Sequence, residues 1–367
     1  LEVQVRGSAG RTIYEGDSPF GGLFGTSYRF RERATGDWVG AEGRLAWEQD
    51  TGHRLVVGAE CRRQVQARYR SWYDSLPYYT VEFPYRVISG YVQEELRFRR
   101  DLDAVIGLRL DDRSPGASAI SPRAALLWHP DPATDVKLLY GWAFRTPTLY
   151  EVEYADPWQS KGNPELTTEK IRTGELVLDR RLGSALMTTA SLYHYRIDDL
   201  IEQRIDSTDG LAQFRNTGQV DAYGLELEAT FRLQIDLSGF ASGSWQRTTD
   251  RGGERLPNSP SLLLKGGLSR SLGQRLVLAT DWRRESGRLT LQRQAGAAPV
   301  STDAYLLGNL RLILRPLLSG RFARLAVTAT VDNLLDTRYQ SPGGAEHRQI
   351  AIEQDGRLWR LGTQYGF

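Results

Sequence analysis

The chain lacks any long hydrophobic segment. Its 367 residues are 40% hydrophobic and 25% charged, and the mean hydropathy is −0.45. A membrane-spanning helix needs about 20 consecutive apolar residues, but apolar runs such as residues 262–264 end at once in charge or glycine. A bundle of membrane helices is therefore excluded, whereas crossing a membrane with short, half-apolar strands is not.

Residues that build metal, redox and catalytic sites are also scarce. Cys61 is the single cysteine, so neither an intrachain disulfide nor a cysteine-rich metal site can form. The four histidines are scattered and have no neighbours at ligand spacing. No G-x-S-x-G, G-x-x-x-x-G-K-[ST] or H-E-x-x-H pattern occurs. The sequence therefore predicts no catalytic residues, no bound metal and no cofactor.

The segment DSTDG, residues 206–210, has the opening of a calcium loop but lacks the later acidic ligands. We interpret it as a loop tip between two strands. Charge is nearly balanced, with 47 Lys and Arg against 45 Asp and Glu and a net charge of +2. A basic surface for nucleic acid is not indicated, so no nucleic-acid partner is expected.

A two-residue period is the strongest pattern that the chain contains. In QVDAYGLELEATFRL, residues 219–233, the odd-numbered positions from Tyr223 onward are apolar, and Glu226 and Glu228 lie on the opposite face. The same alternation occurs in residues 53–61, 103–112 and 321–333. Such segments of about ten residues are typical of tilted membrane strands, whereas strands of soluble sandwiches average about five or six.

The predicted connections alternate between short and long. We expect short turns near residues 49–52, 100–102, 130–134, 182–183, 233–234, 271–273 and 316–320. We expect long loops near residues 14–36, 69–84, 113–121, 145–169, 204–213, 248–259, 285–301 and 334–354. Short turns on one side and long loops on the other are typical of an outer-membrane barrel, with periplasmic turns and extracellular loops.

The prediction is an all-β, antiparallel transmembrane barrel portion of about 16 strands. Residues 163–179 have an acidic start that could open a helix, but Gly174 and β-branched residues favour a loop followed by a strand. A soluble β-sandwich is disfavoured by strand length and loop asymmetry. The sequence has no repeat of fixed period, which argues against a propeller.

The predicted long loops are rich in aromatic residues. Rigid rings beside arginine or lysine suit a bulky, anionic, partly aromatic ligand, although barrels also carry aromatic girdles at the membrane interface. The candidate ligand-binding residues are Trp72, Tyr73, Tyr78, Tyr79, Arg145, Tyr150, Tyr154 and Trp158.

Four stretches resemble the TonB-dependent outer-membrane receptor family. They are GWAFRTPTLYEVEY followed by GNPELTTEK, then NTGQVDAYGLELEA, then VDNLLDTRY, and the terminal strand ending in Phe367. The motif residues are Phe144, Arg145, Pro147, Asn163, Pro164, Leu166, Tyr223, Gly224, Glu226, Asn333, Leu334, Asp336 and Phe367. The resemblance covers essentially the whole chain.

The resemblance implies a barrel of 22 strands closed by an N-terminal plug, of which residues 1–367 would be the C-terminal barrel part. The plug and about six strands would then precede Leu1, and the piece as given is predicted not to close correctly by itself. The implied partners are the TonB energy-coupling complex, outer-membrane lipids, a small metal-chelate ligand and, through Phe367, the barrel-assembly machinery.

The implied function is energy-dependent uptake of an iron–siderophore complex, cobalamin or a similar scarce ligand across the Gram-negative outer membrane. Haem is disfavoured, because residues 148–162 contain no histidine. His347, with Glu346, falls in the final extracellular loop and is a further ligand-binding candidate. The alternatives are a passive porin-like channel and an outer-membrane enzyme, such as a lipase whose Ser–His pair forms only on folding.

Overall fold

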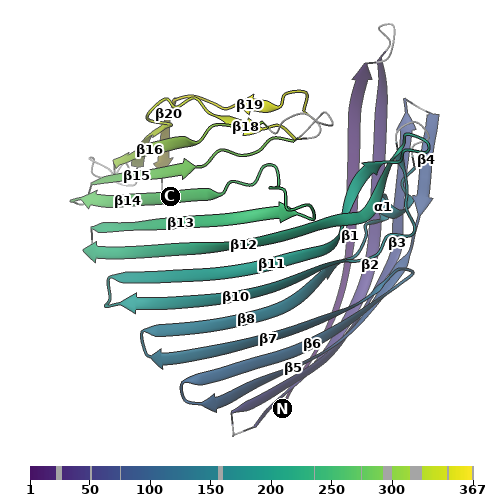
Figure 1. Ribbon diagram of the computed structural model, residues 1–367, viewed down its shortest axis with the longest axis horizontal. Helices are drawn as coiled ribbons and strands as arrows, with labels where there is room; N and C mark the ends of the chain where they lie inside the picture. The colour runs from purple at the N-terminus through teal and green to yellow at the C-terminus, as the bar shows by residue number, and fades with distance from the viewer. Residues whose placement is uncertain are drawn as a thin grey trace. The chain divides into compact units, whose positions relative to one another are not determined.

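The computed structural model describes residues 1–21, 27–49, 52–74, 76–155, 160–234, 236–273, 275–291, 300–314, 325–344 and 347–365. This part of the chain is nearly all strand, with 20 strands and one short helix (Figure 1). Eighteen strands belong to one sheet, and β18 and β19 form a separate two-stranded sheet. No helix in these ranges is both long and apolar enough to cross a bilayer.

The elements, in chain order, are β1 (Glu2–Gly21), β2 (Ser27–Gln49), β3 (His53–Tyr73), β4 (Leu76–Glu82), β5 (Tyr85–Arg99), β6 (Leu102–Ser114), β7 (Ser118–Asp131), β8 (Thr134–Arg145), α1 (Leu149–Glu153), β9 (Ser160–Lys161), β10 (Glu169–Leu182), β11 (Leu186–Ile205), β12 (Ala212–Gln234), β13 (Leu237–Asp250), β14 (Leu262–Leu272), β15 (Leu276–Glu285), β16 (Tyr305–Leu314), β17 (Leu325–Asp332), β18 (Gln340–Pro342), β19 (Ala351–Glu353) and β20 (Leu358–Tyr365). Neighbouring strands pair mostly in antiparallel fashion, and β9 pairs parallel with β12.

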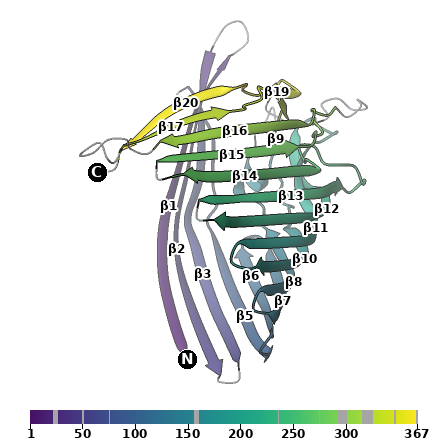
Figure 2. The same cartoon turned by 90° about the vertical axis from the view of Figure 1, so that its left-hand side faces the viewer.

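The chain forms two compact units. Unit 1 comprises residues 1–127, 139–173 and 196–219, and unit 2 comprises residues 128–138, 174–195 and 220–367. In unit 1, antiparallel pairing joins β1 to β2, β2 to β3, β3 to β5 and β5 to β6 (Figure 2). Strand β4 folds back on the end of β3 (Figure 1). In unit 2, each strand from β12 to β17 pairs with the next, and β20 pairs with β17.

The two faces of the sheet in unit 1 have opposite chemistry. On β6, Ile106 is 57% exposed and Leu108 and Leu110 are also exposed. Arg109 and Asp111 lie on the other face, where the guanidinium of Arg109 is 2.8 Å from Asp111 and 3.1 Å from Glu60. An exposed apolar face opposite a face of paired charges inverts the arrangement of a soluble protein, and it fits a sheet that faces lipid on its apolar side.

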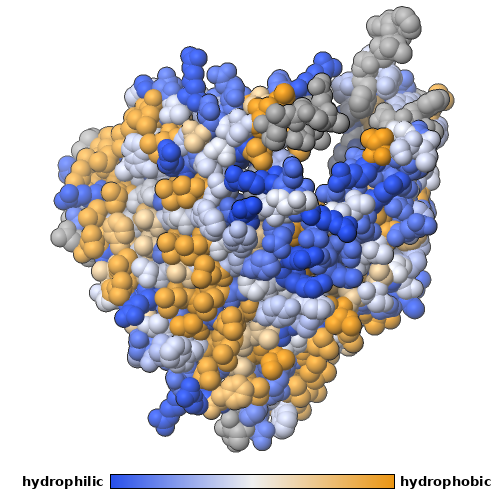
Figure 3. All heavy atoms as spheres, in the orientation of Figure 1, coloured by the Kyte–Doolittle hydropathy of each residue, from blue (hydrophilic) through white to orange (hydrophobic). Residues whose placement is uncertain are grey.

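Unit 2 repeats this division. Leu227 on β12 is 50% exposed, and Trp245 and Leu268 on the next two strands are exposed on the same face. Figure 3 shows apolar residues gathered over the strands that Figure 1 labels β12 to β15. On the opposite face, Asn309 donates a 2.7 Å hydrogen bond to Asp281. The predicted two-faced strands are therefore confirmed.

Two of the predicted loops were placed wrongly. Residues 14–36 and 69–84 are mostly strand, so Trp72 and Tyr73 lie on β3, and Tyr78 and Tyr79 lie on β4. Hydrophobic alternation ends there because cross-strand ion pairs take over, such as Arg33 with Glu15 (3.3 Å) and Arg68 with Glu82 (2.8 Å). A hydrophobic period cannot detect a strand whose outward side chains are all polar.

The segment from residue 163 follows its prediction, because β10 begins at Glu169 after a loop. Helix α1 was not predicted. Its start carries a capping box, Thr148-Leu-Tyr-Glu151, which is a recognisable sequence signal for a helix N-terminus.

Candidate functional site

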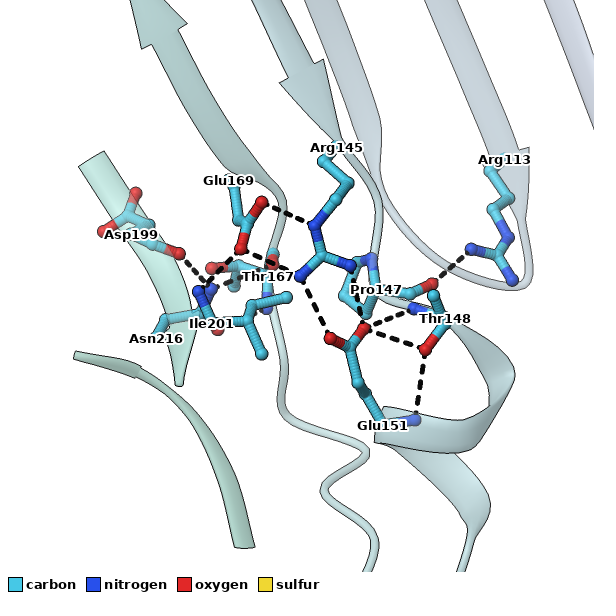
Figure 4. Close-up of polar contacts among 10 residues, drawn as sticks. All are labelled: Arg113, Arg145, Pro147, Thr148, Glu151, Thr167, Glu169, Asp199, Ile201 and Asn216. Carbon is cyan, nitrogen blue, oxygen red and sulfur yellow. Dashed lines mark hydrogen bonds and ion pairs between the residues drawn. The ribbon is translucent and has the colours of Figure 1, made fainter. Parts of the chain in front are cut away.

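Arg145 is the centre of an ionic cluster at the end of β8 (Figure 4). Its Nε and Nη2 donate to the two carboxylate oxygens of Glu169, at 2.5 and 2.8 Å. Its Nη1 and Nη2 donate to the two oxygens of Glu151, each at 3.0 Å. Paired hydrogen bonds of this kind combine charge attraction with a fixed geometry. The guanidinium is thereby held between α1 and the start of β10.

The two carboxylates are bound from other directions as well. Thr148 N donates to Glu151 at 2.7 Å, and Glu151 N donates back to Thr148 Oγ1 at 3.3 Å, which closes the capping box. Ile201 N donates to Glu169 at 2.8 Å. Glu151 is 9% and Glu169 8% exposed. These contacts fix α1 relative to β10 and β11.

The electrostatics of the cluster keep its charges in place. Hydrogen bonds to Glu169 and then Glu151 raise the pKa of Arg145. Burial alone would raise the pKa of Glu151, but the bonds from Arg145 and Thr148 outweigh it and hold that pKa below its usual value. Because the carboxylate stays ionised at neutral pH, the cluster provides an anchor rather than a proton donor.

Next to this anchor, five aromatic rings form a ring cluster; they come from β3, β4, β12, α1 and the C-cap residue of α1. The ring of Tyr150 stacks on that of Tyr154 with centroids 4.6 Å apart. Tyr154 also packs against Tyr79 at 5.5 Å and Tyr69 at 5.7 Å. Phe214 lies 6.1 Å from Tyr150, which is half exposed. The structure thus brings together three of the predicted residues, Tyr79, Tyr150 and Tyr154.

The hydroxyl groups of this cluster are also held. Tyr69 donates to Glu32 at 2.7 Å, and Tyr14 donates to the other oxygen of Glu32 at 2.9 Å. Tyr79 donates to the backbone carbonyl of Glu153, the last residue of α1. Burial and the bond to Glu32 raise the pKa of Tyr69. Burial also raises the pKa of Tyr79, so the phenols of Tyr69 and Tyr79 remain protonated and their rings present neutral faces.

Glu32 also lines a cavity of about 510 Å³ that includes Trp72. This volume is within the range of ligand pockets, about 300–1,000 Å³. The remaining lining residues are Glu15, Gly16, Asp17, Arg31, Arg33 and Asp74. Trp72 therefore lies at a pocket of mixed charge, and its ring is 5.6 Å from the guanidinium of Arg70.

Tyr73 and Tyr78 belong to a second group of rings. Their centroids are 4.7 Å apart, and Tyr73 also contacts Tyr28 at 5.3 Å and Phe30 at 5.2 Å. This group fastens β4 to the tips of β2 and β3.

A lysine clamp closes the loop between β11 and β12. Lys161 Nζ donates to Asp206 at 2.7 Å and to Asp209 at 2.6 Å, and Arg215 donates to Asp206 at 2.7 Å. Thr208 N and Oγ1 donate to the same carboxylate. The bond from Lys161, followed by those from Thr208, lowers the pKa of Asp206. The DSTDG segment is a turn whose two carboxylates bind Lys161 of the same chain, in keeping with the loop-tip prediction.

Comparison with known proteins decides the family. The family model "TonB dependent receptor-like, beta-barrel" matches residues 2–334. The chain belongs to the TonB-dependent receptor family. This match confirms the predicted antiparallel β-barrel class and the outer-membrane location.

Two curated relatives of this receptor chain come from Vibrio cholerae serotype O1. The "Iron-regulated outer membrane virulence protein" is 26% identical over 301 residues, which cover 76% of this chain and 44% of the relative. The "Vitamin B12 transporter BtuB" is 28% identical over 245 residues, which cover 65% of this chain and 36% of the relative. The chain thus spans less than half the length of these relatives.

Solved structures share the fold. The "Copper transporter OprC" aligns with a TM-score of 0.76 and 18% identity, over 100% of this chain and 62% of the other. The ferripyoverdine receptor of Pseudomonas aeruginosa aligns with a TM-score of 0.74 and 14% identity, over 99% of this chain and 54% of the other.

Several motif residues of the receptor family have structural contacts here. Asn163 donates through Nδ2 to the carbonyl of Phe214 at 2.7 Å and accepts from Glu165 N at 3.0 Å. Pro147 is buried, and its carbonyl accepts a 2.8 Å bond from Arg113. Phe144 and Leu166 are partly buried, and Pro164 is exposed. The FRTP and NPEL motifs therefore shape the loop that carries the ring cluster.

The remaining motif residues lie in unit 2. A Cβ on Gly224 would be 2.6 Å from the carbonyl oxygen of Trp245, so this position on β12 requires glycine. Tyr223 packs edge-on against Trp245 at 5.8 Å, and Ser244 donates to Glu226 at 3.5 Å.

Residues 333–337 form a tight turn after β17. Asn333 has φ +51° and its side chain bonds both N and O of Thr337. Leu334 N donates to the Gly308 carbonyl, and Asp336 accepts from Arg357 N at 2.9 Å.

His347 accepts a 3.1 Å bond at Nδ1 from Gly344 N, within the loop before β19. Trp158, Glu346 and Phe367 lie outside the described residues. A cavity of about 890 Å³ lies at the short-turn end of unit 2, beside Gly183 and Ser184, and none of the predicted ligand residues lines it. In the described ranges, no group of three or more His, Cys, Asp or Glu could hold a metal ion.

The sequence reading missed Tyr69, Phe214, Glu32, Glu151 and Glu169. Glu151 could have been found from the capping box. Tyr69 and Phe214 carry no local signal, because they meet Tyr154 and Tyr150, respectively, across long sequence distances.

Proposed function

We propose that this chain is the barrel part of an outer-membrane receptor that takes up a scarce metal chelate, such as an iron–siderophore complex or cobalamin, through TonB-dependent transport. The chain would act without covalent chemistry, by binding the ligand and enclosing its path. The observation that carries the proposal is the ring cluster fixed by Arg145, in a chain that belongs to this family.

The ring cluster suits a bulky ligand with flat, partly aromatic groups. Tyr150 exposes half of its surface and is backed by Tyr154, so a ligand ring could stack on it without reordering the site. Arg145 donates to two carboxylates of its own chain. We therefore propose that Arg145 acts on ligand binding by positioning α1, while Tyr79, Tyr150 and Tyr154 offer the contact surfaces.

The relatives support the ligand class. Their names refer to iron regulation, vitamin B12, copper and ferripyoverdine, all of which involve metals or metal chelates. Loop residues set selectivity in such receptors, so uptake measured with each ligand class distinguishes these ligands.

The test uses the complete gene product in outer membranes. Radiolabelled ferric siderophores and cobalamin are offered at nanomolar concentration, and uptake is followed with and without a protonophore. One ligand is expected to accumulate only while the inner membrane is energised. Ligand-independent conductance in planar bilayers, without energised uptake, would instead support the porin-like alternative.

The site is tested with the double variant Y150A/Y154A. Removing both rings is expected to weaken binding of the identified ligand by on the order of 10- to 100-fold, as for loss of aromatic contact residues elsewhere. The matched control is Y223A, which removes a tyrosine ring that packs against Trp245 in unit 2. Equal binding by Y150A/Y154A and Y223A would exclude the ring cluster as the ligand site.

A further inference from the structure

The apolar face of unit 1 has sharply defined ends on β3. Leu55, Val57, Ala59 and Cys61 share this face, since they alternate along the strand. One end is marked by His53, whose Nδ1 lies 3.3 Å from Glu94. The other end is marked by Arg63, which lies directly opposite Arg86 on β5 in the strand register.

Arg63 and Arg86 are exposed and have no ion-pair partner within the ranges that the structure covers. Three other arginines on this face are matched by acids across the strands: Arg11 with Asp37 at 2.7 Å, Arg33 with Glu15 at 3.3 Å and Arg68 with Glu82 at 2.8 Å. Directly opposed residues have Cβ atoms about 5 Å apart, and like charges at that spacing are unfavourable.

The surroundings of the pair are apolar on the side of the band. On β2, Val39 lies directly opposite Arg63. Two residues away along β3 and β5, on the same face, Cys61 and Ile88 lie opposite each other. Val39 and Ile88 are each about half exposed. Two guanidinium groups above exposed aliphatic side chains match the junction between a phosphate headgroup and its acyl chains.

The orientation indicates which leaflet is involved. Beyond Arg63, β3 continues for ten residues to Tyr73, whereas beyond His53 only a short turn leads back to β2. In outer-membrane barrels the long extensions are extracellular and the short turns periplasmic. The arginine pair therefore lies at the outer-leaflet margin of the apolar band.

We propose that Arg63 and Arg86 form a binding site for the phosphate of an outer-leaflet lipid headgroup, with the acyl chains against Val39 and Ile88. Arginine binds phosphate oxygens through paired N–H groups. A bound phosphate would remove the repulsion between the two guanidinium groups. This lipid site does not depend on ligand uptake, so it can be tested separately from the transport function.

The experiment measures lipid binding to the full-length receptor purified in detergent from outer membranes. Bisphosphorylated lipid A is titrated against wild type and R63Q/R86Q, and dephosphorylated lipid A is titrated in parallel. The double variant is expected to bind the bisphosphorylated lipid on the order of 30-fold more weakly. Binding of the dephosphorylated lipid should change less than about threefold.

The matched control is R33Q/R68Q, which removes the same charge from two arginines on the same face that are paired with acids. It is expected to bind bisphosphorylated lipid A like wild type. Equal losses in the two double variants, or equal affinity of R63Q/R86Q and wild type, would overturn the proposal. If R63Q/R86Q lacks the heat-modifiable gel mobility of a folded barrel, the single variants R63Q and R86Q give the test, each with an expected loss of about fivefold.

Discussion

Arg145 is the residue on which the candidate site most depends, because it is the cation shared by Glu151 and Glu169. Both carboxylates are nearly buried, and a buried carboxylate without its partner is costly. The arginine side chain is itself two-fifths exposed, so solvent weakens the attraction.

We predict that R145A lowers the local stability of residues 148–154 by about 2–3 kcal/mol, at the low end for a broken buried pair. Faster hydrogen exchange at Glu151, Val152 and Tyr154 amides, measured by mass spectrometry on the full-length receptor, would report this loss. R145K keeps the charge but cannot span both carboxylates, so its exchange should be intermediate. Unchanged exchange in R145A would show that α1 is held by the capping box alone.

At the scale of single elements, sequence patterns predicted some strands well and others poorly. On β12 the alternation from Tyr223 to Leu233 identified the face correctly, because an exposed apolar side and a polar side differ in hydrophobicity. On β1 to β3, beyond the apolar band, the outward residues are ion pairs such as Arg11 with Asp37. That pairing stabilises strand structure without leaving a hydrophobic period.

The same limit applies to the site. Aromatic residues near Arg145 were identifiable from composition, but their neighbours Tyr69 and Glu32 depend on the register of β2 with β3. Register is a long-range property, since a shift by one residue exchanges the two faces. Local sequence therefore pointed to Tyr79, Tyr150 and Tyr154, which the structure brings together, but not to Tyr69 or Phe214 or to the bonds that hold the rings.

The lysine clamp between β9 and the β11–β12 loop gives an element-scale prediction. The pKa of Asp206 is lowered by Lys161, so its stabilising contribution is complete above the ordinary aspartate pKa of about 3.9 and is lost as pH falls through its lower folded value. The pKa of Lys161 is raised by Asp206 and Asp209, so its contribution is complete below about 10.4 and is lost only above that. The loop should stay closed from pH 5 to pH 9.

This stability range can be followed with a nitroxide spin label on S207C, in a background with Cys61 replaced by alanine. The line shape is expected to remain unchanged from pH 9 to pH 5 in the parent. D206N should give a mobile spectrum throughout that range, because the lysine loses its main anion. A line shape that loosens between pH 7 and pH 5 in the parent would contradict the clamp.

At the scale of the whole molecule, both units place apolar side chains on one face of the sheet and pair their charges on the other. Such a sheet is stable only where the apolar face meets a non-aqueous medium. The family match places that medium in the outer membrane, so the cost of a misplaced charge should depend on the face and not on the strand.

Two substitutions on β12 test this dependence. L227R puts a cation on the apolar face, where it should cost about 2–4 kcal/mol if the residue lies near the bilayer midplane. T230R adds the same charge three residues along, on the polar face, and should be nearly neutral. The measurement is the folded fraction of the full-length receptor in outer membranes, from heat-modifiable gel mobility, together with urea unfolding in phospholipid vesicles. We expect a lower urea midpoint of unfolding for L227R alone, because only that side chain must lose its water to lipid. Equal effects of the two substitutions would mean that lipid does not cover the apolar face of unit 2.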